Sequence, residues 1–388
     1  MSMYDAHDIV EQKKRDKRKR RLVRFTLFIL VVLTGMTLYI THELWMPKLR
    51  GIGDHYQTIV NDGRLAEGNF PIDINGGEQY QLSCSNGNVI VLSDSYIYFY
   101  NEEGGLVTSR QHAYSNAVME ASNGRALIFE SGGNDFSVED RGGILYSQHL
   151  DTNIMFARLS KEGYTAVVMT SENYDCEIKV YDRKGSVIYE RKCIERVNDI
   201  CFKDSSKGCV ISYFYAENGS LVTSVQETSF TEDKEKWTSP GLDTLGLDVY
   251  GFDGGAFVLG IDACGYVSDT GQITSLYRYD GDFAGGASSN GKSAVIINSD
   301  DTRKYVMALF DGVSAEPVIV NFDSPLIDVV VEDDLAYVME QDAVAAYDFT
   351  GTLRSTAAVN DSYTGFVRSD TYMFLKSYNK IDRIDYQS

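Results

Sequence analysis

The chain contains 388 residues, of which 43% are hydrophobic and 24% are charged, with 34 glycines against only 5 prolines. This composition excludes a collagen-like or largely disordered chain and supplies enough apolar side chains for a packed core. The formal net charge of −20 is unevenly distributed: residues 1–24 hold nine Lys or Arg and four acids, a net of +5, so residues 25–388 carry −25. Such an excess of acids disfavours nucleic acid and anionic wall polymers as direct partners.

The first predicted element is a transmembrane helix over residues 25–46. Residues 25–40 are sixteen consecutive uncharged residues, and Leu44, Trp45 and Met46 extend the apolar stretch. Sixteen to about twenty such residues, at about 1.5 Å each, can cross a hydrocarbon core of roughly 30 Å. No small-x-small cleavage site follows, which favours an uncleaved anchor over a cleaved signal peptide; a buried core helix is the remaining alternative.

The orientation in the membrane follows from the basic tail, residues 1–24. Its cluster KKRDKRKRRLVR lies on the amino side of the span, so the positive-inside rule places the N-terminus in the cytoplasm. Basic runs of this kind also attract anionic lipid or nucleic acid, but next to a span a role in topology is the simplest interpretation. We therefore expect a single-pass protein of the cell membrane with an extracellular C-terminal domain.

Residues 47–67 are predicted to be a linker, and residues 68–388 a repeating all-β domain. Short runs of β-branched and aromatic residues alternate with Gly, Asn, Asp and Ser turns, which is typical of strands joined by tight hairpins. Eight strongly apolar runs mark the repeat, starting 36 to 47 residues apart. They are residues 88–93, 125–130, 164–169, 208–214, 255–261, 293–298, 335–340 and 371–376.

A period near 40 residues with about four strands per unit predicts a β-propeller. We expect eight blades, with seven as the alternative because the fourth and fifth repeats are long and irregular. The last repeat lacks a fourth strand, whereas a spare strand, NFPIDI (69–74), precedes the first unit. This spare strand could complete the final blade and remove the open edge that it would otherwise expose.

Segments such as EIKVYDRKGSVIY (177–189) resemble the repeats of quinoprotein-type and WD40-type propellers. The whole layout of a short basic tail, one span and a Tyr-rich acidic propeller resembles the membrane-anchored propeller proteins of Firmicutes, a family with no established activity. The resemblance lies in architecture, since no recurring Trp-Asp ending is present. It implies a propeller fold and assigns no site residues.

The residues offer little support for an enzyme, so no catalytic or cofactor-binding residue is predicted. Only His112 and His149 fall in the propeller, and neither G-x-S-x-G nor H-E-x-x-H occurs. Their equal position in successive repeats leaves a metal pair open, with solvated strand ends as the simpler interpretation. Acidic turns such as 280–282, 298–301 and 331–334 could hold Ca²⁺ weakly, but this composition produces such turns by chance.

Six cysteines lie in the predicted extracellular part, where disulfides can form. Cys176 and Cys193 flank the turn at 183–185 almost symmetrically and could face each other across a hairpin. Cys201 and Cys209 flank the turn at 204–207 in a similar way. Buried thiols are the alternative for all six, because a large propeller core needs no staples.

The function expected from these observations is a protein-binding or scaffolding platform in the bacterial cell envelope. A protein partner is predicted, and the acidic surface favours a cationic or metal-bridged one. A ligand-sensing subunit that signals through a membrane partner is the alternative, and a propeller enzyme with its site in the central channel is a third.

Overall fold

The computed structural model describes residues 69–385 apart from 75–78, 204–206, 233, 313–315, 333, 361 and 370–371. Within this described part, no helix has the length and apolar character needed to cross a membrane. The predicted tail 1–24, transmembrane helix 25–46 and linker 47–67 lie outside the described residues.

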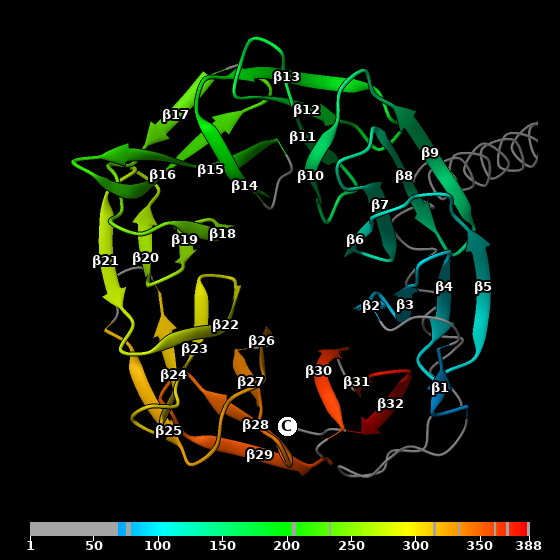
Figure 1. Cartoon of the computed structure of the whole chain (residues 1–388), viewed down its shortest axis with the longest axis vertical. Helices are drawn as coiled ribbons and strands as arrows, with labels where there is room; N and C mark the ends of the chain where they lie inside the picture. Colours follow the sequence, from blue (N-terminus) through cyan, green and yellow to red (C-terminus); the bar gives the residue numbers. More distant parts are fainter. Residues whose placement is uncertain are drawn as a thin grey trace, which may run out of the picture. The chain divides into compact units, whose positions relative to one another are not determined.

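The described chain forms eight four-stranded antiparallel sheets arranged around a central opening (Figure 1). The fold is therefore an eight-bladed β-propeller, as predicted, and the seven-bladed alternative is wrong. Each blade contributes one innermost strand to the channel wall. These strands are β2 (Gln81–Ser85), β6 (Ala117–Ser122), β10 (Ile154–Leu159), β14 (Arg196–Phe202), β18 (Gly246–Phe252), β22 (Asp282–Ser289), β26 (Asp328–Glu332) and β30 (Tyr363–Arg368).

The second strand of each blade coincides with one of the eight apolar runs of the sequence. These strands are buried along most of their length because blades pack against both of their faces. They are β3 (Asn88–Leu92), β7 (Arg125–Glu130), β11 (Thr165–Met169), β15 (Gly208–Glu217), β19 (Gly255–Gly260), β23 (Lys292–Ser299), β27 (Leu335–Met339) and β31 (Tyr372–Ser377).

The third and outermost strands complete each blade. The third strands are β4 (Tyr96–Asn101), β8 (Asp135–Asp140), β12 (Cys176–Tyr181), β16 (Ser220–Ser229), β20 (Ala263–Ser268), β24 (Lys304–Asp311), β28 (Ala343–Asp348) and β32 (Lys380–Asp385). The outermost strands are β5 (Leu106–Gln111), β9 (Gly143–His149), β13 (Val187–Cys193), β17 (Lys234–Thr238), β21 (Ile273–Arg278), β25 (Val318–Phe322), β29 (Leu353–Ala358) and β1 (Ile72–Asp73).

Asp-to-Gly turns join the third and outermost strands in several blades. Asp182 Oδ1 accepts hydrogen bonds from the backbone N–H of Lys184 and Ser186, at 2.8 and 2.9 Å. The chain then passes through Gly185 with φ of 81°, a left-handed conformation that glycine adopts without steric cost. The prediction of strands joined by tight turns rich in Asp and Gly is thus confirmed in this hairpin.

The ring is closed by the spare N-terminal strand. Ile72 pairs with Ile381, and Asp73 pairs with Lys380, so that β1 becomes the outermost strand of the blade whose other strands are C-terminal. Ile72 packs in a buried cluster that also contains Ile381. The prediction that residues 69–74 complete the final blade is confirmed.

Neighbouring innermost strands are tied together by polar side chains. Asp199 Oδ2 accepts a hydrogen bond from Val249 N–H at 2.8 Å, and Asp328 Oδ2 accepts one from Phe366 N–H at 3.1 Å. The inward edge of each such strand would otherwise leave backbone donors unpaired. These contacts explain why carboxylates occur on strands that line the middle of the ring.

Candidate functional site

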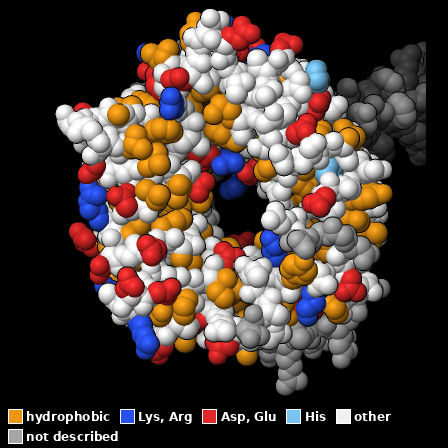
Figure 2. Space-filling view, in the orientation of Figure 1, with side chains coloured by type: hydrophobic (Ala, Val, Ile, Leu, Met, Phe, Trp, Pro, Cys, Tyr) orange, Lys and Arg blue, Asp and Glu red, His pale blue; other side chains and the backbone are white. Residues whose placement is uncertain are grey.

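The central channel holds a cluster of charged side chains, which we call the Arg158 cluster. It consists of Arg158 on β10 with Glu120 on β6, Asp199 on β14 and Asp248 on β18. The guanidinium donates to Asp199 Oδ1 at 2.9 Å and to Glu120 Oε1 at 2.7 Å, and lies 3.7 Å from Asp248 Oδ1. Figure 2 shows acidic and basic side chains together on the wall of the opening.

Burial sets the protonation behaviour of the Arg158 cluster. Only 3% of the Asp199 side chain is exposed, and burial raises the pKa of this carboxyl to about 6 although Arg158 acts in the opposite direction. Burial also raises the pKa of Glu120 against the influence of Arg158. Three carboxylates around one guanidinium leave an excess of negative charge in the channel when all are ionised.

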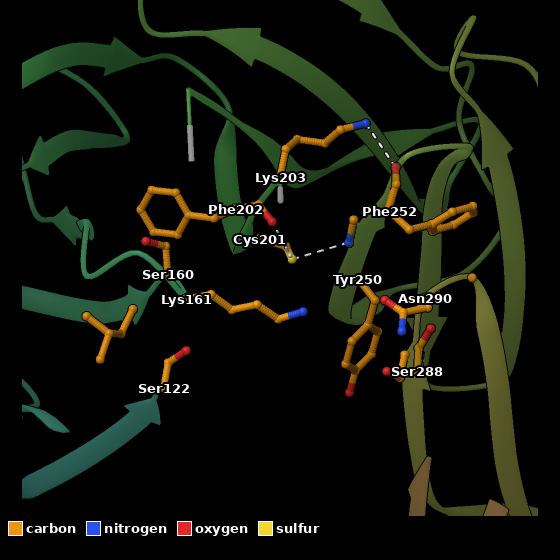
Figure 3. Close-up of a pocket in the computed structure, with 14 residues that line it drawn as sticks. Ser122, Ser160, Lys161, Cys201, Phe202, Lys203, Tyr250, Phe252, Ser288 and Asn290 are labelled. Carbon is orange, nitrogen blue, oxygen red and sulfur yellow. Dashed lines mark hydrogen bonds between the residues drawn. The ribbon is translucent and has the colours of Figure 1, made fainter. Parts of the chain in front are cut away.

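One end of the channel is hollowed into a cavity of about 260 Å³, which we call the mouth pocket (Figure 3). Its wall comes from the carboxyl-terminal ends of β6, β10, β14, β18 and β22 and from the turns that follow them. A second hollow shares Lys161, Ser289 and Asn290 with the mouth pocket and adds residues of β2, β26 and β30. All eight blades therefore contribute to this end of the channel.

The mouth pocket has a charge opposite to that of the whole propeller. Its fourteen lining residues include Lys161 and Lys203 and no carboxylate. Figure 3 shows Lys161 extending into the pocket, whereas Lys203 turns away and donates to the carbonyl oxygen of Phe252 at 2.9 Å. Burial raises the pKa of the Tyr250 hydroxyl in the same wall, and Asp248 and Asp199 raise it further.

Lys203 also forms an ion pair with Glu227, a residue with only 4% of its surface exposed. The Glu227 carboxylate accepts hydrogen bonds from Lys203 at 3.2 Å, from Lys236 at 2.8 Å and from the Trp237 indole at 3.0 Å. Burial alone would raise the pKa of Glu227, but these lysines lower it overall. The contacts fix the position of Lys203 and leave Lys161 as the lysine directed into the cavity.

A second candidate surface lies on the outer edge of the propeller. The outermost strands β5, β9 and β13 follow one another around the ring (Figure 1), and each has two consecutive exposed apolar residues near its start. We call this set the rim stripe: Leu106, Val107, Ile144, Leu145, Val187 and Ile188, with 40 to 59% of each residue exposed. Repeated apolar exposure on neighbouring elements is typical of an interaction surface.

The structure brings one of the two predicted cysteine pairs together. Cys176 and Cys193 are directly opposite in the register of β12 and β13, and both are buried thiols. Cys201 instead pairs with Val210, while Cys209 pairs with Phe202. Because side chains alternate between the two faces of a sheet, Cys201 and Cys209 point to opposite faces.

The two propeller histidines each pair within their own blade. His112 Nε2 lies 2.9 Å from the carbonyl oxygen of Ser93, and His149 Nδ1 lies 2.8 Å from Asp135. Among the described residues, no group of three or more His, Cys, Asp or Glu side chains is arranged to hold a metal ion. Of the acidic turns, Asp280 contacts Lys304 at 2.5 Å and Asp334 contacts Lys292 at 3.1 Å.

The Arg158 cluster was not singled out by the sequence reasoning. Its members lie on separate strands, with Arg158 separated from Glu120 by 38 residues and from Asp199 by 41. Both spacings are close to the repeat period of about 40 residues, so charged residues that recur on innermost strands once per repeat are a signal that could have located the channel wall.

The model of a family of unknown function (DUF5711) matches residues 69–385 of the chain. No curated protein matches it. Among solved structures, BamB from Moraxella catarrhalis is 12% identical, with a TM-score of 0.56 over 85% of this chain and 98% of that chain. Sqt1 from Saccharomyces cerevisiae is 9% identical, with a TM-score of 0.59 over 85% and 100%. The computationally designed protein Ika8 is 13% identical, with a TM-score of 0.62 over 81% and 98%. At these identities the likeness concerns the fold alone.

Proposed function

Because this chain belongs to DUF5711, a family of unknown function, we propose its role from its own residues: it presents an extracellular propeller, anchored by residues 25–46, as a platform that binds a protein partner in the cell envelope. The rim stripe carries this proposal. Closed rings suit such a role, because closure makes a rigid scaffold on which surface positions vary without loss of the fold.

The rim stripe favours a protein rather than a small molecule or a polymer. Two apolar side chains from each of three adjacent blades offer an extended surface, whereas the outermost strands β21, β25 and β29 expose single residues, Leu276, Ile319 and Leu353. An apolar stripe on a domain with a strongly negative net charge fits a partner with its own apolar patch and a basic border.

The test is affinity capture of the tagged full-length protein after cross-linking in intact cells, read by mass spectrometry. We expect a reproducible partner that is lost when the propeller is deleted and reduced at least tenfold in Leu106→Lys/Ile144→Lys/Val187→Lys. The matched control, Leu276→Lys/Ile319→Lys/Leu353→Lys, makes three equivalent changes elsewhere on the rim and should keep the partner. Equal loss in both triple variants, or no partner above a span-only control, would refute the proposal.

The mouth pocket favours ligand sensing as the second candidate function. A cavity with a lysine directed into it and no carboxylate in its wall suits a small anion, even on an acidic protein. Deleting residues 1–20 separates the two candidates if the topology is kept, since a platform would still capture its partner, whereas a sensor would lose the cytoplasmic part that passes the signal on.

A further inference from the structure

The buried pair Cys176 and Cys193 is in position for a covalent bond. The two residues are directly opposite on adjacent antiparallel strands, where Cα atoms lie about 4.5–5.5 Å apart, within the range that a disulfide requires. Each is 1% exposed, and both belong to the same buried packing cluster. The strand register therefore already places the two cysteines opposite each other, as a disulfide across the hairpin requires.

The other cysteines are not in position for a second bond. Cys201 and Cys209 lie on opposite faces of the sheet formed by β14 and β15, in different packing clusters. Cys84 lies in β2 and Cys264 in β20, which belong to two other blades. Six cysteines can form three disulfides in fifteen combinations, and none of these combinations is compatible with the observed positions. The single bond between Cys176 and Cys193 is compatible with them.

We propose that Cys176 and Cys193 form the one disulfide of this propeller, joining the outermost strand β13 to β12, and that the other four cysteines stay reduced. The oxidant is a small-molecule or protein disulfide. One thiolate of the pair attacks the oxidant and releases its first thiol; the second cysteine then displaces the oxidant's remaining sulfur. The two electrons reduce the oxidant to two thiols, and these thiols take up the two protons that the cysteine thiols have lost.

The local structure favours this reaction. Contact with the Cys193 thiol lowers the pKa of Cys176, although burial acts against ionisation, so the pairing of the two thiols favours formation of a thiolate at this site. An oxidant can reach the buried pair because β13 is an outermost strand and ends at Cys193, and the next residue, Ile194, is 76% exposed. Fraying of this strand end gives access without unfolding the blade.

The experiment uses the purified full-length protein in detergent, reduced with dithiothreitol, freed of reductant, and then incubated with oxidised glutathione. The protein is denatured, alkylated with iodoacetamide and analysed by intact-mass and peptide mass spectrometry. We expect six alkylated cysteines before oxidation and four afterwards, with a peptide linking Cys176 to Cys193. Six alkylated cysteines after oxidation, glutathione adducts alone, or a link between other cysteines would overturn the proposal.

A stability measurement gives an independent readout. The bond closes the loop between Cys176 and Cys193, and a disulfide across a loop of this length stabilises the folded state. The melting temperature of the oxidised protein should therefore be on the order of 3–6 °C above that of the reduced protein. In Cys176→Ser/Cys193→Ser the oxidant should leave the melting temperature unchanged, whereas Cys201→Ser/Cys209→Ser should retain the full shift. A shift in melting temperature that persists without Cys176 and Cys193 would contradict the assignment. If a variant fails to fold, the peptide mapping of the oxidised wild-type protein still tests the proposal.

Discussion

Asp199 shows how a propeller uses a charged residue where an apolar one would be expected. Its two oxygens are divided between Arg158 in the previous blade and the backbone N–H of Val249 in the next. The carboxyl therefore joins three consecutive blades at the channel wall. The cost of this arrangement is the burial of an ionisable group, which is visible in the raised pKa of Asp199.

This burial predicts a pH-dependent effect of Asp199→Asn. Folding raises the pKa of Asp199 from 3.8 to about 6, so the folded state binds a proton more tightly than the unfolded state. The stability of the wild type relative to Asp199→Asn should be greatest below pH 4, fall by roughly 3 kcal/mol as the pH rises through 6, and stay constant above about pH 7.

The measurement is chemical denaturation of both proteins from pH 4 to pH 8, in the same detergent and at constant ionic strength. The difference between their free energies of unfolding removes most of the contribution of other groups. A difference that rises with pH over this interval, or that stays flat, would contradict burial as the dominant influence on this carboxyl.

Among the elements, the two-residue strand β1 has an importance out of proportion to its length. It supplies the fourth strand of a blade whose edge would otherwise be open, and Ile72 is only 5% exposed. Close by, Arg383 of β32 donates to the carbonyl oxygen of Glu102 in the first complete blade at 2.6 Å. Apolar packing and this hydrogen bond together join the two ends of the propeller.

Ile72→Ala should therefore destabilise the propeller by about 2–4 kcal/mol, because it leaves a cavity in the closing strand. The control is Ile144→Ala, the same chemical change on β9 at a residue that is 59% exposed, with an expected effect within about 0.5 kcal/mol. Denaturant midpoints of the two variants and the wild type provide the comparison. Equal effects in the two variants would mean that β1 does not contribute to closure.

The elements also show what the sequence could and could not predict. The second strands are continuous apolar runs because neighbouring blades cover both of their faces, so their number and spacing predicted eight blades. The charged segment Lys234–Thr238 has no alternating apolar pattern, yet it forms β17. Its charged residues fit an outermost strand that faces solvent, where the apolar pattern that signals a strand is absent.

The candidate sites were harder to predict than the strands. The facing of Cys176 and Cys193 followed from their nearly equal distances to one turn, because hairpin register depends on local sequence. The similar spacing of Cys201 and Cys209 also suggested that they face each other, but the register pairs Cys201 with Val210 and Cys209 with Phe202. This difference of one residue places the two side chains on opposite faces of the sheet. The mouth pocket combines residues from five blades, and no local pattern encodes which turns meet there.

At the scale of the whole molecule, the proposed function depends on the prediction that the chain crosses a membrane with its C-terminal domain outside. Residues 1–24 carry a net charge of +5 and the rest of the chain −25. In intact cells with an accessible surface, added protease should remove an epitope tag at the C-terminus and spare one at the N-terminus. In permeabilised cells the protease should remove both tags. A C-terminal tag that survives in intact cells but is lost after permeabilisation would contradict the predicted orientation.

The closure of the ring also has a consequence for synthesis on the ribosome. The Tyr80 hydroxyl oxygen lies 2.8 Å from the carbonyl oxygens of both Ser377 and Lys380, between which its single proton is shared; these residues are 297 and 300 positions away along the chain. Each of the first seven blades can pair its own strands as soon as they emerge, since these contacts are local. The segment that closes the ring is among the first parts of the domain to be made, yet its partner is the last. A translating chain must therefore keep β1 unpaired until synthesis is complete. A premature stop near the C-terminus would release an unclosed propeller, in which β1 is present but its partner strand β32 is missing.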